Sequence, residues 1–303
     1  DMIVKVKEPQ AQERKMLRSG QILFTYLHLA PDMPQTKDLL ESGCTAIAYE
    51  TVTDRRGGLP LLAPMSEVAG KLAPQVGSWT LQKANGGRGV LMGGVPGVSP
   101  AKVIVIGGGV VGTHAAKVSA GMGADVTVLD RSLERMRYLD DVFSASFKCE
   151  FSSSANIARL IQEADMVIGA VLIPGASAPK LISKCQLSSM KPGSVLVDVA
   201  IDQGGCFETS RATTHADPIY EVDGVVHYCV ANMPGAVART STEALGNSTL
   251  PYMLELANKG WKRACSENPH LANGLNVHDG QVTYQAVADA LGLPCVSLDS
   301  VLQ

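Results

Sequence analysis

The sequence predicts an α/β protein whose central part is a doubly wound parallel sheet, joined to a second, discontinuous α/β domain. Apolar strand-like runs alternate with amphipathic helical stretches from residue 101 to 200, the pattern of parallel strands joined by right-handed crossovers. A glycine-rich turn follows the first of these runs. Segments of a different pattern lie before and after this region, so we expect them to fold together as the second domain.

The central strands are expected to be short and apolar. They are placed near residues 103–106, 126–129, 147–151, 166–171 and 194–199, with a sixth at 225–230. Such continuous apolar runs are typical of parallel strands that are buried on both faces.

The outer segments also contain strand-like and helical patterns. Strand-like segments are expected at residues 4–9, 22–28 and 45–50, and helical segments at 242–258, 261–270 and 281–291. Ser66 is expected to cap a helix that links the domains. We therefore assign residues 1–60 and 236–303 to a substrate domain and 61–235 to a nucleotide domain, with the ligand in the cleft between them.

Composition indicates a soluble globular protein. The chain has 303 residues, 46% of them hydrophobic and 18% charged, which allows two domains. Its formal net charge of −3 gives no attraction to nucleic acids or anionic membranes. The chain shows neither an apolar run of membrane-spanning length nor a basic segment followed by an apolar one, so a cytoplasmic location is expected.

Cysteines and histidines give no sequence-local metal motif. The seven cysteines are scattered without CxxC or Cys/His metal spacing, which favours reduced and mostly buried thiols. The six histidines are equally dispersed, so we assign no metal ligands.

The glycine-rich turn predicts a dinucleotide site. A β-branched run at Val103–Ile106 leads into Gly107-x-Gly109-x-x-Gly112. The glycines permit a tight turn, close approach of a pyrophosphate and close packing of the next helix, which presents its N-terminus to the anion. Alone, such a turn is also compatible with a simple tight connection; strand, turn, helix, strand and acid in this order favour the Rossmann interpretation.

Asp130 is expected to select the cofactor. It ends the next apolar run, 23 residues after Gly107, where a ribose-binding carboxylate belongs. Its charge favours NAD, because it would repel the 2′-phosphate of NADP. The neighbouring Arg131 leaves NADP open, since an arginine pairs with such a phosphate.

Three polar residues are expected at the ends of apolar strands, where open α/β sheets place ligands. They are Lys7, His28 and Asp202. Singly, each is also compatible with a solvated strand end or, for His28, a hydrogen-bonded core histidine. Together beside a nicotinamide they provide a cation, a proton acceptor and an acid, as oxidation of an amine or alcohol requires.

Neighbouring segments extend this set. The glycines of Asp202-Gln-Gly-Gly indicate close approach of a ligand, and Asn232 is placed to contact cofactor or substrate, unless it belongs to an ordinary turn. The segment Val171–Gly175 is expected over the ribose or pyrophosphate. Asp198, inside an apolar strand, is interpreted as a buried, paired carboxylate.

Several longer motifs resemble the alanine dehydrogenase family over essentially the whole chain. These motifs are Lys5-Val-Lys-Glu-Pro9, Leu27-His-Leu-Ala30, Ala48-Tyr-Glu-Thr51, Pro60-Leu-Leu-Ala-Pro-Met-Ser-Glu-Val-Ala-Gly70, Gly94-Val-Pro-Gly-Val98, Asp198-Val-Ala-Ile-Asp-Gln-Gly-Gly205, Val230-Ala-Asn-Met-Pro234 and Thr240-Ser-Thr242. The resemblance implies NAD-dependent, reversible oxidative deamination of L-alanine to pyruvate and ammonia. It also implies a two-domain subunit that assembles into hexamers.

The resemblance assigns the substrate lysine to Lys7 and the catalytic pair to His28 and Asp202. Together with the glycine-rich turn, it gives a set of expected NAD contacts. These are Ser66, Gly107, Gly109, Val110, Val111, Gly112, Asp130, Arg135, Ser152, Val171, Leu172, Val199, Ala200, Ile201, Asp202, Arg211, Val230, Ala231, Asn232 and Met233.

Alternatives remain at this point. The NAD-binding subunit of proton-translocating transhydrogenase is similar in its nucleotide domain, but lacks this combination of His28 and Asp202-Gln-Gly-Gly. Family members begin with further strands that include an arginine holding the substrate carboxylate, whereas this sequence enters a strand directly at Asp1. We therefore expect sequence upstream of Asp1, because alanine binding would weaken without that arginine. A shortened or inactive NAD-binding homologue and a dehydrogenase of another small amino acid are the other hypotheses.

Overall fold

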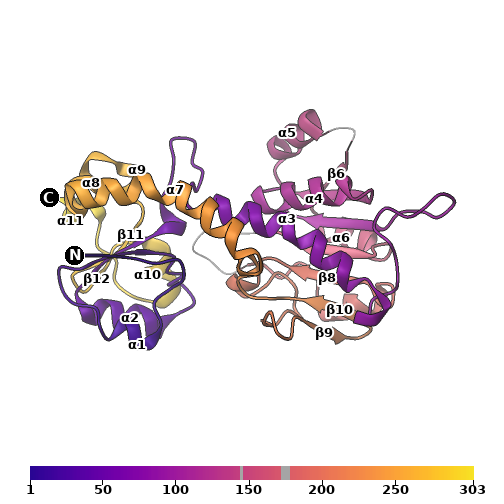
Figure 1. The fold of residues 1–303 in the computed structure, drawn as a ribbon, viewed down its shortest axis with the longest axis horizontal. Coiled ribbons are helices and arrows are strands. Elements are labelled where there is room, and N and C mark those ends of the chain that lie inside the picture. Colours follow the sequence, from indigo (N-terminus) through magenta and orange to yellow (C-terminus); the bar gives the residue numbers. More distant parts are fainter. Residues whose placement is uncertain (144–145, 172–177) are drawn as a thin grey trace. The chain divides into compact units, whose positions relative to one another are not determined.

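The structure is a computed structural model that describes residues 1–143, 146–171 and 178–303, and it divides into two units (Figure 1). The first unit contains Asp1–Pro64 and Thr242–Gln303, and the second contains the described residues between Met65 and Ser241. Each unit has its own sheet covered by helices. The predicted α/β fold class is confirmed.

The second unit is built on a seven-stranded sheet. In spatial order its strands are β6 (Lys148–Phe151), β5 (Asp125–Asp130), β4 (Lys102–Ile106), β7 (Met166–Gly169), β8 (Val195–Asp198), β10 (Val225–Tyr228) and β9 (Ile219–Val222). The first six strands are parallel, and β9 is antiparallel to β10. Strand order reverses between β4 and β7, which is where doubly wound sheets bind their ligands.

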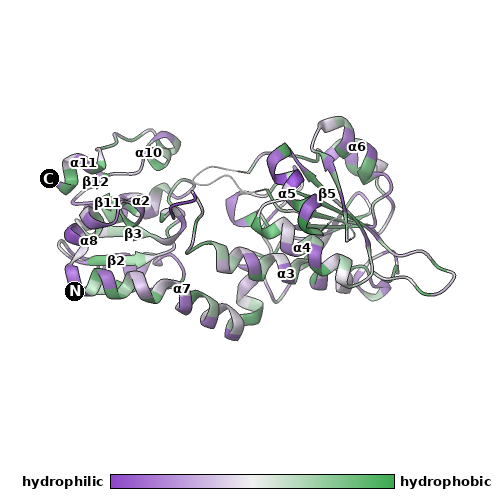
Figure 2. Cartoon of the chain, turned by 90° about the horizontal axis from the view of Figure 1, so that it is seen from above, coloured by the Kyte–Doolittle hydropathy of each residue, from purple (hydrophilic) through white to green (hydrophobic). Residues whose placement is uncertain are grey.

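The alternating side chains of β4 explain its continuous apolar sequence. Val103 and Val105 pack into the buried cluster that includes α3 and α4, whereas Ile104 and Ile106 pack into the cluster on the other face, with α6. Figure 2 shows the apolar residues of this sheet lying between polar outer helix faces. Because both faces of the strand are covered, its four buried positions, Val103–Ile106, are all apolar.

The helices of the second unit alternate with its strands. They are α3 (Ala63–Thr80, which begins in the first unit), α4 (Val110–Gly121), α5 (Leu133–Phe143) and α6 (Ser154–Ile161), with short 3-10 helices η2 (Lys83–Asn85), η3 (Lys184–Ser189), η4 (Ile201–Gln203) and η5 (Met233–Val237). We expected Ser66 to cap this helix, and that expectation was wrong: α3 already starts at Ala63, so Ser66 lies inside the helix. Pro64 explains the earlier start, since its fixed φ suits the first helical turn.

The first unit has a five-stranded sheet. In spatial order its strands are β1 (Met2–Val4), β2 (Ile22–Thr25), β3 (Thr45–Ala48), β11 (Leu275–His278) and β12 (Gln281–Val282). The first three strands are parallel, and β11 and β12 each run antiparallel to the preceding strand. A buried cluster that includes Leu23, Leu39 and Val287 joins the sheet to its helices.

The helices of the first unit are mostly short. They are α1 (Ala11–Arg14), α2 (Met33–Ser42), α8 (Trp261–Glu267), α9 (Pro269–Ala272), α10 (Gln285–Leu291) and α11 (Leu298–Leu302), besides the 3-10 helix η1 (Tyr49–Thr51) and the long α7 (Ala238–Lys259), whose first four residues belong to the second unit. Among the helices of the described residues, none has the length and apolar character needed to cross a membrane.

Several expected boundaries were wrong. The segment 261–270 is two helices, because Asn268 and Pro269 begin a new helix there. The segment 281–291 begins as strand β12 and becomes helical only at Gln285. The strand-like segments at residues 4–9, 22–28 and 45–50 end earlier, at Val4, Thr25 and Ala48.

Two strands, β9 and β11, were missed. Each pairs with its neighbour through an Asp-Gly turn, at Asp223-Gly224 and Asp279-Gly280, in which both residues have positive φ. Asp-Gly is the preferred sequence for such hairpin turns. These dipeptides were therefore the signal for both hairpins.

Candidate active site

The glycine turn after β4 has no room for side chains at two of its three positions. Gly107 has a φ of +105°, and a Cβ there would lie 2.7 Å from the Ala170 carbonyl oxygen. A Cβ on Gly112 would lie 1.7 Å from the Gly107 carbonyl oxygen. At Gly109, in contrast, a Cβ would meet no atom within 4 Å. The turn is thus closed toward the protein and open at Gly109.

The open side coincides with the start of α4. Gly109 is the N-cap residue and supplies no side-chain cap, so the first turn of the helix lacks a side-chain acceptor for its N–H groups. Uncapped N–H groups at a helix N-terminus bind anions well. Val110 is exposed at this end, whereas Val111 is buried. These features fit the pyrophosphate of a dinucleotide.

Asp130 and Arg135 both hold this turn. Asp130 ends β5, and its carboxylate accepts hydrogen bonds from the N–H groups of Gly108 at 2.6 Å and Ser132 at 2.7 Å. The Arg135 guanidinium donates to the Gly108 carbonyl at 2.6 Å and to the Thr113 hydroxyl at 2.7 Å. The structure therefore brings these two predicted residues to the glycine turn.

Two other predicted contacts, Ser152 and Val171, lie beside the same turn. Ser152 follows β6, and its N–H donates to the Asp130 carbonyl at 2.8 Å. Val171 is half-buried and follows β7; one of its methyl groups lies 3.1 Å from the Cβ position of Gly107. Ser66 is half-buried within α3. Leu172 lies outside the described residues, as does most of the segment 171–175.

The loops after β8 and β10 meet each other. The Asn232 N–H lies 3.3 Å from both carboxylate oxygens of Asp202, and Asn232 adopts a left-handed φ of +56°. Because β8 and β10 are parallel neighbours, their carboxyl ends lie at one edge of the sheet. Asp202 and Asn232, predicted separately, are thus direct partners.

The remaining predicted contacts of these loops differ in exposure. Ala200, Ile201, Val230 and Met233 are buried, Val199 and Ala231 are half-buried, and Arg211 is exposed. The Arg211 guanidinium stacks on the ring of Tyr220, 3.9 Å from its centroid.

Asp198 is a buried carboxylate, as expected, and its partners are hydrogen-bond donors. It accepts from the N–H groups of Ala200 at 3.0 Å and Cys206 at 2.8 Å, and from the Ser210 hydroxyl. Burial raises the pKa of this carboxyl. A Cβ on Gly205 would lie 2.7 Å from a carboxylate oxygen of Asp198. This second glycine of the Asp202-Gln-Gly-Gly segment therefore makes room for Asp198.

In the first unit, Lys7 and His28 follow neighbouring parallel strands. The Lys7 carbonyl accepts from the Thr25 hydroxyl at 3.1 Å, and its ammonium lies 3.4 Å from the Glu8 carboxylate. His28 adopts a φ of +48°, and its ring stacks on Tyr26 with 5.8 Å between centroids and an angle of 4°. The structure thus brings Lys7 and His28 to one edge of this sheet.

Glu50 lies at the same edge and was not predicted as a site residue. It follows β3, and its side chain is only 11% exposed. Its carboxylate accepts from the N–H groups of Leu27 at 3.2 Å and His28 at 2.6 Å. The signal in the sequence was a carboxylate two residues after a buried strand, the same rule that gave His28.

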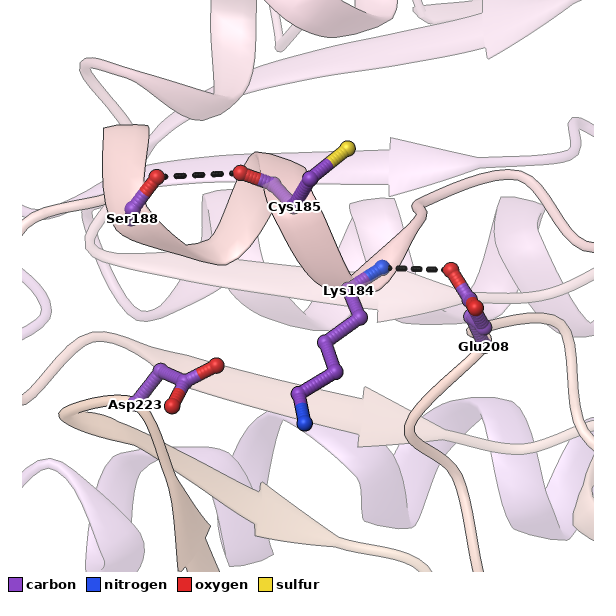
Figure 3. A pocket seen from close by; sticks show the side chains of 5 residues that line it. All are labelled: Lys184, Cys185, Ser188, Glu208 and Asp223. Atoms are coloured by element: carbon purple, nitrogen blue, oxygen red, sulfur yellow. Dashed lines mark hydrogen bonds between the residues drawn. The ribbon is translucent and has the colours of Figure 1, made fainter.

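One further hollow contains none of the predicted site residues. In the second unit, Lys184, Cys185, Ser188, Glu208 and Asp223 line it (Figure 3). The Lys184 N–H donates to Glu208 at 2.6 Å, and the Ser188 hydroxyl donates to the Cys185 carbonyl at 3.0 Å. Within the described ranges, we find no group of three or more histidine, cysteine or acidic residues that could hold a metal ion.

Comparisons with known proteins agree on one family. Residues 1–69 match the family model "Alanine dehydrogenase/PNT, N-terminal domain", and residues 73–285 match "Alanine dehydrogenase/PNT, C-terminal domain". A protein of Halomonas elongata named alanine dehydrogenase is 62% identical over 302 residues, which cover 100% of this chain and 81% of that protein.

Solved structures give the same result. A structure titled L-alanine dehydrogenase is 52% identical, with a TM-score of 0.89 over 96% of this chain and 80% of that chain. A transhydrogenase from Sinorhizobium meliloti is 25% identical, with a TM-score of 0.77 over 93% of this chain and 81% of that chain. On these matches, the chain belongs to the alanine dehydrogenase/PNT family.

Proposed function

We propose that this chain catalyses the NAD-dependent, reversible oxidative deamination of L-alanine to pyruvate and ammonia. The observation that carries the proposal is the identity of 62% over the full chain with a protein named alanine dehydrogenase. Two sets of residues support the proposal. The glycine turn and Asp130 suit the cofactor that accepts a hydride, and the strand-end residues Lys7 and His28 suit substrate binding and proton transfer.

In this proposal the two parts of the chain have separate tasks. Residues 61–235 bind NAD, and residues 1–60 and 236–303 bind the amino acid. The start of α4 and the open position at Gly109 suit the pyrophosphate, and Asp130 suits the ribose hydroxyls. Asp130 favours NAD over NADP by charge.

NAD, when bound, accepts the α-hydride of the substrate. Lys7 neutralises the substrate carboxylate or polarises its carbonyl oxygen. His28 exchanges protons with the substrate as water adds and ammonia leaves, a task that histidine side chains commonly perform in enzymes. Asp202 belongs to the NAD-binding part, where it accepts from the main-chain N–H of Asn232, and is the second residue assigned to proton transfer.

Assembly and location follow from the family resemblance. We propose a homo-hexamer in the cytoplasm, with no membrane or nucleic-acid partner. The formal net charge of −3 is consistent with this. Light scattering after gel filtration measures the mass directly, and a mass other than six chains contradicts the hexamer.

The test of the chemical role compares two histidines of one unit. His28→Ala should lower kcat by at least about 100-fold, the contribution expected of a proton-transferring side chain, with unchanged NAD affinity by calorimetry. His278→Ala is the matched control: His278 ends β11 at the opposite edge of the sheet, where it bonds to Thr45. It should keep near-normal kcat. Equal losses of kcat and NAD affinity in His28→Ala would contradict the assignment.

A substrate panel separates the competing functions. NADH formation with alanine, but much less with serine, glycine or lysine, supports the proposal. Turnover of another amino acid would favour a related dehydrogenase. NAD binding without any turnover would favour an inactive homologue or a transhydrogenase-like NAD-binding subunit.

A further inference from the structure

We infer that Glu50 positions His28 for proton transfer, an inference that rests on the proposed function. Glu50 follows β3 and His28 follows β2, and these strands are parallel neighbours with Thr25 opposite Ala48. The two residues are 22 positions apart in the sequence, yet the sheet places them side by side.

The main chain at His28 needs support. Its φ of +48° lies in the left-handed region, which costs a residue with a side chain about 1–2 kcal/mol. Asp223 and Asp279 also have positive φ, but both occupy Asp-Gly hairpin turns that favour this conformation. His28 lies in no such turn, so neighbouring groups must hold it there.

The Glu50 carboxylate supplies this support. It accepts hydrogen bonds from two successive N–H groups, those of Leu27 at 3.2 Å and His28 at 2.6 Å. Hydrogen bonds to an ionised carboxylate are roughly twice as strong as neutral ones. From the other side, the Gln35 side chain donates to the Leu27 carbonyl. The peptide unit that leads into His28 is therefore fixed at both ends.

The imidazole ring is held by a second contact, with the ring of Tyr26. The ring stacks on Tyr26, whose hydroxyl donates to the Leu61 carbonyl at 2.5 Å. Burial, and then the nearby Glu50 charge, raise the pKa of Tyr26, so this ring stays neutral. A carboxylate oxygen of Glu50 lies 3.9 Å from His28 Nδ1, beyond hydrogen-bond length. Glu50 therefore acts on His28 mainly through its main chain.

Three substitutions test this role. Glu50→Ala removes the acceptor, and a misplaced proton-transfer group costs up to about 100-fold in kcat. We expect a loss of that order, with KM for NAD unchanged. Glu50→Gln keeps an oxygen acceptor and should recover most of the lost kcat. In a His28→Ala background, Glu50→Ala should cause no further loss, because the group that it positions is gone.

The matched control is Asp54→Ala. The Asp54 carboxylate also accepts from two main-chain N–H groups of the first unit, those of Arg56 and Gly58, both at 2.8 Å. Its loss removes the same kind of bond from a different turn, so kcat should stay near that of the wild type. A loss in Asp54→Ala as large as in Glu50→Ala would overturn the inference, because it would show a general structural effect.

Hydrogen exchange provides a readout that does not need turnover. In Glu50→Ala, the peptide containing Leu27 and His28 should exchange its amides at least about tenfold faster than in the wild type, as expected when a protecting bond is lost. Unchanged exchange, or wild-type kcat in Glu50→Ala, overturns the inference. A third outcome separates the two proposals. If the wild type does not oxidise alanine but Glu50→Ala still exchanges these amides faster, the proposed function is overturned and the positioning role of Glu50 is retained.

Discussion

Replacing Gly112 by alanine should damage the nucleotide turn. The new Cβ would lie 1.7 Å from the Gly107 carbonyl oxygen. Ordinary carbon contacts begin at about 3.5 Å, so α4 and the turn would have to separate by almost 2 Å. The Thr113 hydroxyl, which donates to the Gly108 carbonyl at 3.0 Å, would move with the helix. Such overpacking typically costs about 1–3 kcal/mol.

Two other glycines provide matched controls. Gly109 has a φ of −66° and open space around its Cβ position, so Gly109→Ala should unfold like the wild type. It should nevertheless weaken NAD binding by at least about tenfold, or 1.4 kcal/mol, because the methyl group occupies the pyrophosphate approach. Gly121→Ala, in open space at the end of α4, should change neither property appreciably.

Calorimetry measures both quantities. For a unit of this size, each kcal/mol lowers Tm by roughly 2–4 °C, and titration with NAD gives the affinity. Gly112→Ala should lose stability and affinity, and Gly109→Ala only affinity. Wild-type Tm for Gly112→Ala, or wild-type affinity for Gly109→Ala, would refute this view of the turn.

Three further predictions concern charge, thiols and cofactor choice. Hydrogen bonds from Lys259 and Arg263 lower the pKa of Glu267 from 4.5 to about 2. The stabilisation by ionised Glu267 is therefore present above pH 4.5 and lost as the pH falls toward 2. The Tm difference between wild type and Glu267→Gln should shrink over that range, and a constant difference would contradict this prediction. Cys185 is exposed, whereas burial raises the pKa of the Cys265 thiol to about 12. The reaction with Ellman's reagent at pH 8 should therefore have a fast phase that is absent in Cys185→Ser. A fast phase that persists in Cys185→Ser would contradict this prediction. Asp130→Ser should lower the preference for NAD over NADP in kcat/KM; an unchanged ratio would exclude Asp130 as the selecting residue.

The nucleotide sheet was predictable because its signals are local. The apolar run at Val103–Ile106, the three glycines and the acid at Asp130 follow one another in the sequence, and each has a steric or electrostatic reason. The two missed hairpins were also local, at Asp223-Gly224 and Asp279-Gly280. Their short strands carry little periodic signal, so the turn dipeptides were the better indicator.

The contacts between distant strands were less predictable. Strand-end position identified Lys7, His28 and Asp202 as candidates, but the sequence does not say which strands are neighbours. The bonds from His28 to Glu50 and from Asn232 to Asp202 depend on that order. The start of α3 before Ser66 has a different, local reason. A proline in the first turn is also a start signal for a helix, and here it lies ahead of the capping hydroxyl.

Isotope transfer tests the proposed oxidation of L-alanine at its reacting bond. When the chain is incubated with L-alanine deuterated at C2 and with NAD, we expect reduced cofactor that carries the deuterium on its nicotinamide ring, with equal amounts of pyruvate and ammonia. Mass spectrometry of the cofactor measures this transfer. Bound NAD that stays oxidised, or reduced cofactor without deuterium, would contradict the proposed oxidation of alanine.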